Sequence, residues 1–193
     1  STAVFSNVDL YNFSKHSFTS RSFGFANAYT AIAEGEETII ANPAGLAYPG
    51  SGYSYQVLDL DNANTSTYQG HFYYNKPFGF SSIVKKDFNG NHLTQNVIGL
   101  GFLGTNGVSW GVNYKSIYGS VNGESIDGWS SDLGVLFHLF SWLKLGANFK
   151  DIYSTDIDLN SSFNLALAGF HSKNSFLWTI ESVYDNDTAR EII

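Results

Sequence analysis

The chain has 193 residues but contains no cysteine and no methionine. The missing cysteines exclude a disulfide framework and a thiolate metal site. The missing methionines mean that the initiator residue is not part of this sequence, so we expect a processed or trimmed chain. Residues 1–5 have neither the basic nor the apolar region of a signal peptide, and we expect any such peptide to have been removed.

Charge is also scarce, because charged residues make up 14% of the chain against about 25% in typical soluble domains. The net charge of −7 argues against a nucleic-acid partner, since no basic stripe could neutralise phosphates. No apolar run approaches the roughly 18 residues of a membrane-spanning helix. Aromatic residues, in contrast, reach 17%, and there are 19 glycines. This composition favours a membrane β-barrel, in which each strand needs an apolar residue only at every second position. A soluble β-sandwich or lipocalin-like barrel is the alternative.

From residue 52 onward the chain alternates apolar and polar residues in runs that predict β-strands. In the clearest run, one face carries Val108, Trp110, Val112 and Tyr114, and the other carries Ser109, Gly111, Asn113 and Lys115. Nine such runs cover about residues 52–60, 66–75, 78–87, 94–104, 107–118, 128–139, 142–153, 162–171 and 174–185, and residues 191–193 begin a tenth. Each is close to the 9–11 residues that a tilted transmembrane strand needs.

The breaks between these runs alternate in length. Short breaks fall at 76–77, 105–107, 141 and 172–173, whereas longer polar breaks fall at 61–65, 89–93, 119–127 and 154–161. Aromatic residues lie near both sets of breaks, as in the two girdles at membrane interfaces. We therefore predict an all-β, antiparallel transmembrane barrel whose apolar face contacts lipid. Asn113 and Lys115 are expected to face inward.

The segment before the strands is rich in small residues and contains the sequence Asn42-Pro43-Ala44-Gly45-Leu46. Pro43 disfavours helix at Asn42, so the motif predicts a turn. Residues 21–48 resemble the start of the mature chain in outer-membrane barrels of the FadL type, the long-chain fatty-acid channels. They resemble even more closely the PorV-like relatives, which work with type IX secretion. The resemblance implies a location in the bacterial outer membrane and a structural role for the turn residues Asn42, Pro43, Ala44 and Gly45.

The resemblance also implies a domain organisation. Residues 1–50 would form an N-terminal lead and lumenal plug, and residues 51–193 would form barrel strands. Barrels of this superfamily have fourteen strands, so the chain is expected to be an incomplete barrel of about nine strands and the start of a tenth. Gly99, Gly101 and Gly104 are expected to be thin positions of the wall that face the plug.

No sequence pattern predicts catalysis. The five histidines form no metal-ligand motif, and no serine lies in a Gly-x-Ser-x-Gly sequence. We therefore expect no enzyme activity, metal or cofactor.

The resemblance instead implies a channel for small hydrophobic molecules. The residues expected to contact such a ligand in the lumen are Phe23, Phe25, Tyr29, Ile32, Ile39 and Ile40; alternatively, these side chains only pack the plug against the wall. A secretion or surface-assembly partner on the same fold, which would bind proteins through its long loops, is one alternative function. A soluble β-barrel binding protein is another.

Overall fold

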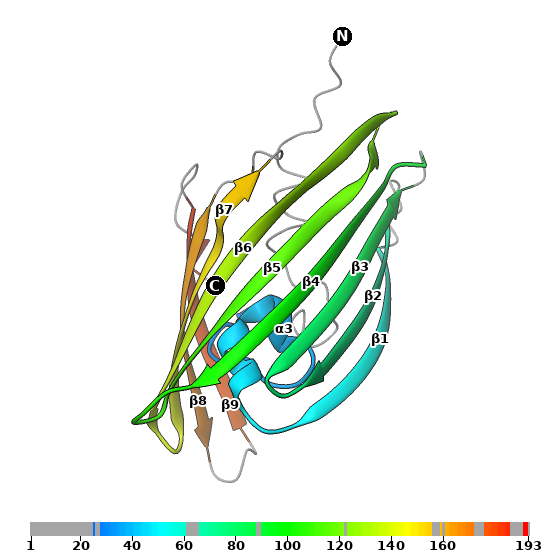
Figure 1. Ribbon diagram of the computed structural model, residues 1–193. Coiled ribbons are helices and arrows are strands. Elements are labelled where there is room, and N and C mark those ends of the chain that lie inside the picture. The colour runs from blue at the N-terminus through cyan, green and yellow to red at the C-terminus, as the bar shows by residue number, and fades with distance from the viewer. Residues whose placement is uncertain are drawn as a thin grey trace.

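The computed structural model describes residue 25 and residues 28–60, 66–87, 90–121, 123–155, 159, 161–171, 176–185 and 191–192. These residues form one open antiparallel sheet in which neighbouring strands follow each other in chain order from β1 to β10 (Figure 1). The strands are β1 (Ser51–Leu60), β2 (Ser66–Asn75), β3 (Phe78–Asp87), β4 (His92–Leu103), β5 (Val108–Val121), β6 (Glu124–Phe140), β7 (Leu143–Thr155), β8 (Ser162–His171), β9 (Phe176–Asp185) and β10 (Glu191–Ile192). The predicted all-β, antiparallel class is confirmed. In the described part of the chain, no helix is long and apolar enough to cross a membrane.

The nine predicted strands are found with bounds that shift by a few residues, and one predicted break is wrong; the breaks at 61–65 and 172–173 lie outside the described residues. The expected loop at 119–127 is wrong, because β5 continues to Val121 and pairs there with Glu124, the first residue of β6. The connecting sequence Asn122-Gly123 is the pair that two-residue hairpin turns favour, and Gly123 has a φ of 82°. This long hairpin extends beyond the neighbouring strands (Figure 1). Local turn chemistry therefore overrides the polar composition that suggested a loop.

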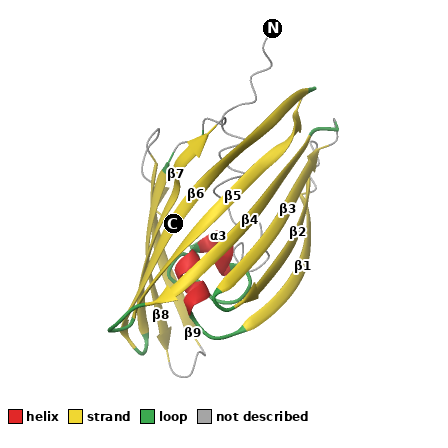
Figure 2. Cartoon of the chain, in the orientation of Figure 1, coloured by secondary structure: helices red, strands yellow, loops and turns green. Residues whose placement is uncertain are grey.

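Two short helical segments lie on the concave side of the curved sheet (Figure 2). They are α3 (Thr38–Ala41), which contacts β3 and β4, and the 3-10 helix η1 (Pro43–Ala47), which contacts β4, β5 and β6. Asn42 separates them in an extended conformation, with φ −162° and ψ 108°. Pro43 occupies the first position of η1, where its missing N–H costs nothing.

The two faces of the sheet differ in the way that the alternation predicts. On β5, Val112 and Tyr114 are 38% and 49% exposed on the convex face. Asn113 and Lys115, which alternate with them, are only 3% and 2% exposed on the concave face. The predicted inward direction of Asn113 and Lys115 is confirmed.

Glycines let the N-terminal segment lie directly against the concave face. A Cβ at Gly111 would overlap the backbone of Pro43, and one at Gly146 would overlap the backbone of Thr30 and Ala31. A Cβ at Gly101 would likewise overlap the backbone of Leu46 and Ala47, and one at Gly99 would overlap the side chains of Asn113 and Leu46. The close approach expected at these two positions is therefore found, and the role of the segment as a plug stays a prediction. The expectation is wrong for Gly104, an exposed residue at the turn after β4.

Gly146→Val is expected to displace the N-terminal segment, because overpacking a close contact typically costs about 1–3 kcal/mol. Ala147→Val, at the adjacent position on the opposite face, is the matched control. Limited proteolysis should show faster cleavage within residues 28–50 for Gly146→Val alone, while the strands stay protected. Equal cleavage of the two variants would mean that the segment is not held at this contact.

Candidate functional site

Asn42 is the centre of the contact between the N-terminal segment and the sheet. Its Nδ2 donates to the carbonyl oxygens of Thr30 at 2.9 Å, Val135 at 3.2 Å and Ala147 at 3.3 Å. Its Oδ1 accepts from the backbone N–H of Ala44 at 3.1 Å. The side chain is fully buried, so these bonds are shielded from water. One amide therefore fixes the start of η1 and joins the segment to β6 and β7.

Polar side chains from three other strand positions hold the backbone of the same segment. Asn148 Nδ2 donates to Ala41 O at 2.7 Å, and Asn113 Nδ2 donates to Ile39 O. Glu181 on β9 accepts from the N–H of Thr30 at 3.1 Å and from its hydroxyl at 2.7 Å. Sequence reasoning put Asn113 on the inner face but assigned none of these partners. The sequence does show one such polar residue at an inward position of β5, β7 and β9, and this pattern could have indicated a contact with the N-terminal segment.

Asn42→Ala should loosen the segment, because it removes the buried hydrogen bonds to the Thr30 carbonyl and from the Ala44 N–H, at a cost of about 1–3 kcal/mol. Asn96→Ala is a suitable control, since Asn96 makes only an exposed contact with the Tyr118 hydroxyl at 3.4 Å. Hydrogen exchange should rise in residues 28–48 of Asn42→Ala and stay unchanged in Asn96→Ala. Unchanged exchange in both variants would contradict a clasp at Asn42.

Tyr48 holds the end of the segment where it leaves η1. Its hydroxyl lies 2.7 Å from His138 Nδ1 and accepts from Ser109 Oγ at 3.1 Å. Burial raises the pKa of the Tyr48 hydroxyl above its usual value, although the bond to Ser109 acts in the opposite direction. Tyr48 is therefore a neutral hydrogen-bonding group at physiological pH.

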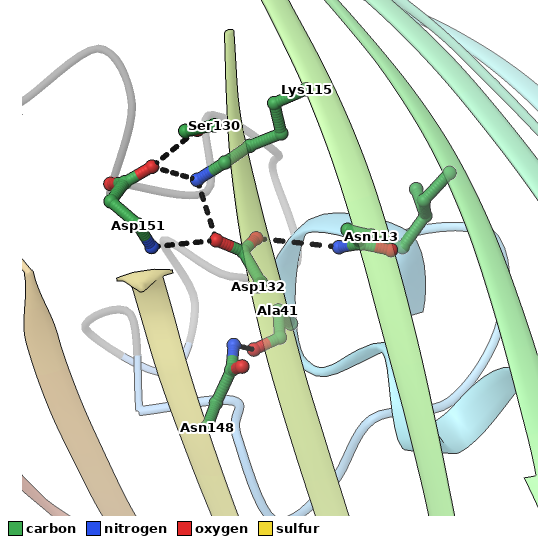
Figure 3. Close-up of polar contacts among 8 residues, drawn as sticks. Ala41, Asn113, Lys115, Ser130, Asp132, Asn148 and Asp151 are labelled. Atoms are coloured by element: carbon green, nitrogen blue, oxygen red, sulfur yellow. Dashed lines mark hydrogen bonds and ion pairs between the residues drawn. The ribbon is translucent and has the colours of Figure 1, made fainter. Parts of the chain in front are cut away.

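A buried ion cluster lies beside this contact on the concave face (Figure 3). Lys115 Nζ lies 2.7 Å from Asp132 Oδ1 and 2.5 Å from Asp151 Oδ1. Ser130 Oγ donates to Asp151 Oδ1 at 2.7 Å, and the Asp151 N–H donates to Asp132 Oδ1 at 2.9 Å. Each side chain in the cluster is buried. The ammonium thus occupies the space between the two carboxylates.

An irregularity in β7 brings Asp151 into the cluster. Ser131 pairs with Tyr153 and Leu133 pairs with Phe149, so three residues of β7 lie opposite Asp132. Asp151 adopts a φ of 52°, and both it and the preceding Lys150 are buried. Strict alternation would put one of these two neighbours on each face, which is why sequence reasoning missed Asp151.

The arrangement cross-links β5, β6 and β7. Among the described residues, no group of three or more His, Cys, Asp or Glu could hold a metal ion. The cluster instead connects to the N-terminal segment, because Asn113 Nδ2 also lies 3.4 Å from Asp132 Oδ2 (Figure 3). Asn113 therefore bridges the ion cluster and α3.

The described residues among those predicted to bind a hydrophobic ligand lie in two hydrophobic clusters. Tyr29 and Ile32 pack with alanines of β8 in one cluster, with Phe25 against it, whereas Ile39 and Ile40 belong to another cluster with Leu46 and inward residues of β2–β5. Phe23 lies outside the described residues. A cavity of about 200 Å³ on β7 to β9 is lined by other residues, including Phe149 and Tyr184. Ligand binding by the six residues stays a prediction.

The convex face carries the exposed aromatic side chains. Near the short turns, Phe102 stacks on Trp110 with ring centroids 4.3 Å apart, and Phe140 stacks on Trp142 at 5.7 Å. Towards the opposite strand ends, Trp129 lies 5.6 Å from Tyr114 and 5.2 Å from Tyr153. No family model, curated protein or solved structure matches the chain. The function must therefore be argued from these two faces.

Proposed function

We propose that this protein is a membrane-embedded β-barrel protein of the bacterial outer membrane, with the N-terminal segment as a plug on its lumenal side. The observation that carries the proposal is the inverted distribution of side chains. Large apolar residues are exposed on the convex face, while Lys115, Asp132 and Glu181 are buried on the concave face. A soluble barrel would place these residue types the other way round, because extended apolar patches on water-exposed surfaces are rare.

Outward-facing apolar residues, some exposed and the others partly exposed, form a belt across β4 to β9, which we call the apolar band. Its members on β4 to β9 are Ile98, Leu100, Phe102, Trp110, Val112, Tyr114, Leu133, Val135, Phe137, Leu145, Ala147, Phe149, Phe163, Leu165, Leu167, Trp178 and Ile180. Each strand contributes consecutive outward positions that pair with those of its neighbours. This is the pattern expected where strands face hydrocarbon and aromatic rings lie at its two borders.

The proposed cargo is a small hydrophobic molecule. Inward residues of β2 to β5, among them Phe72, Ile83, Val97 and Ile117, form one buried apolar cluster with Ile39 of the segment. Water-filled pores have polar interiors, so an apolar inner wall beside the plug favours an apolar cargo. Such a molecule would compete with the segment for this cluster.

The tryptophans provide a test of membrane embedding. The chain has four, and Trp110, Trp129 and Trp178 lie at outward positions, with Trp142 exposed at the β6–β7 turn. In vesicles made from lipids with brominated acyl chains, tryptophan fluorescence should be strongly quenched relative to ordinary vesicles. Trp110→Phe should remove part of the quenching. Fluorescence that bromine leaves unchanged would refute membrane embedding.

A second test addresses the cargo. Val97→Ala shortens a side chain of the inner apolar cluster, whereas the control Ile98→Ala shortens the neighbouring outward side chain. Removing buried methyl groups alters apolar contact worth about 0.8 kcal/mol per CH₂. We therefore expect Val97→Ala to change the affinity for a fluorescent fatty acid several-fold and Ile98→Ala to leave it unchanged. If neither variant binds differently but a co-purifying protein is lost on changing the loops, the secretion-partner function is favoured.

A further inference from the structure

The apolar band is interrupted at β2. If the protein is embedded in a membrane as proposed, this interruption marks a surface that does not face lipid. The outward positions of β2 are Thr67, Gln69, His71, Tyr73 and Asn75, as their pairing with outward residues of β1 and β3 requires. Only Tyr73 among them is apolar in character. No stretch of three apolar outward positions therefore exists on β2, whereas the apolar band of β4 to β8 has such a stretch on each strand.

The tilt of the strands puts the polar residues at the level of the band. Val112 in the middle of the band on β5 pairs with Leu100, which pairs with Phe78, the first residue of β3. Since strands in a barrel are tilted, a belt around the barrel moves along successive strands. On β9 the band ends at Ile180, which aligns through Leu167, Leu145 and Phe137 with Val108 of β5, whereas on β5 itself the band continues to Tyr114. Continued to β2, this shift brings the belt to His71 and Gln69.

His71 and Gln69 lie in a group of six outward residues of β1 to β3, four of them exposed and Gln69 and Ser82 partly exposed, which we call the Tyr–His patch: Tyr53, Tyr55, Gln69, His71, Tyr73 and Ser82. The Tyr53 hydroxyl lies 2.9 Å from His71 Nδ1, and the Tyr55 and His71 rings have centroids 4.6 Å apart. The three tyrosines are each at least 45% exposed. The patch is thus ordered by its own contacts and still presents polar groups outward.

Lipid is a poor neighbour for this patch. The amide of Gln69 and the second ring nitrogen of His71 would have to give up hydrogen bonding in the hydrocarbon layer, which is unfavourable without a partner. Polar side chains at lipid-facing level are therefore expected to contact protein. Tyrosine is also a residue type enriched at protein interfaces.

We infer that the Tyr–His patch is the contact surface of a homodimer, in which it packs against the same patch of a second copy of this chain. The six residues carry no fixed charge, and each can both donate and accept a hydrogen bond. A two-fold contact needs a surface that is complementary to itself, and such groups satisfy that condition without charge repulsion. Copies inserted in the same direction can be related by a two-fold axis along the membrane normal, which brings patch against patch.

The absence of cysteine from the sequence allows a clean cross-linking test in vesicles. Gln69→Cys and Tyr55→Cys introduce a thiol within the patch, and Leu165→Cys introduces one on the outward face of β8. With a short bis-maleimide, the two patch variants should form a cross-linked dimer at least tenfold more efficiently than Leu165→Cys. The double variant His71→Leu with Gln69→Leu, combined with Tyr55→Cys, should lose most of this cross-linking.

A nitroxide on the same single-cysteine variants separates this inference from membrane embedding itself. We expect the label of Leu165→Cys to be accessible to oxygen dissolved in the bilayer and the label of Gln69→Cys to be protected. Equal oxygen accessibility with no dimer would overturn the homodimer and leave embedding intact. A cross-linked product with a different protein would overturn the second copy as occupant. If neither label reached the bilayer, membrane embedding would fail and the inference with it.

Discussion

Replacing Lys115 by methionine is expected to lower the free energy of unfolding by about 3–5 kcal/mol, because it removes the ammonium that lies between two buried carboxylates. Lys115 is the ammonium that lies within 2.7 Å of both Asp132 and Asp151, and its side chain is 2% exposed. Equilibrium unfolding by urea, followed by tryptophan fluorescence, measures the loss. The aliphatic part of methionine fills much of the same volume, so the change is chiefly one of charge.

Lys144→Met is the matched control on the neighbouring part of the concave face. Lys144 Nζ lies 2.7 Å from Glu34 Oε1, but the Glu34 side chain is 48% exposed, so this pair is worth only about 0–1 kcal/mol. Equal losses for the two variants would mean that the Lys115 cluster is hydrated and contributes no more than a surface pair.

The same cluster shows where sequence reasoning succeeds and where it fails. Alternation depends on residues two apart, so it predicts the presence of the nine strands and the inward direction of Asn113 and Lys115; both are confirmed, although the break at 119–127 is not. It fails at Asp151, because a register shift turns this residue to the same face as Lys150. A register shift depends on the pairing of two strands, and no pattern within one strand contains that information.

The contacts of the N-terminal segment could not be predicted for a related reason. The Asn42 amide bonds to Val135 and Ala147, which lie 93 and 105 residues further along the chain. The motif around Pro43 predicts a turn from local chemistry, and η1 is found there, but the partners of the turn depend on how β6 and β7 curve beneath it. The glycines were the useful signal, since Gly99 and Gly101 indicated a close approach to the wall.

A regular strand supplies alternate residues to the concave and the convex face. On β5, Asn113 and Lys115 connect the N-terminal segment to the ion cluster, and Val112 and Tyr114 lie between and beside them on the convex face. A substitution of Lys115 therefore tests whether the buried charges on the concave face stabilise the protein. A substitution of Val112, three residues earlier on the same strand, tests whether the convex face contacts lipid.

Val112→Arg is expected to destabilise the protein in a bilayer by about 2–4 kcal/mol, because arginine near mid-strand on a lipid-facing surface must enter the hydrocarbon layer. Ser120→Arg is the control, since Ser120 also faces outward on β5 but lies near the hairpin end, where an arginine should cost about 0–1 kcal/mol. Asn113 is unsuitable as a control because it is buried against Ile39. Folding into vesicles, titrated with denaturant, measures both values. If Val112 faced water, its exposed side chain would tolerate arginine within about 0.5 kcal/mol, and equally small effects at the two positions would reject the lipid-facing assignment of the apolar band.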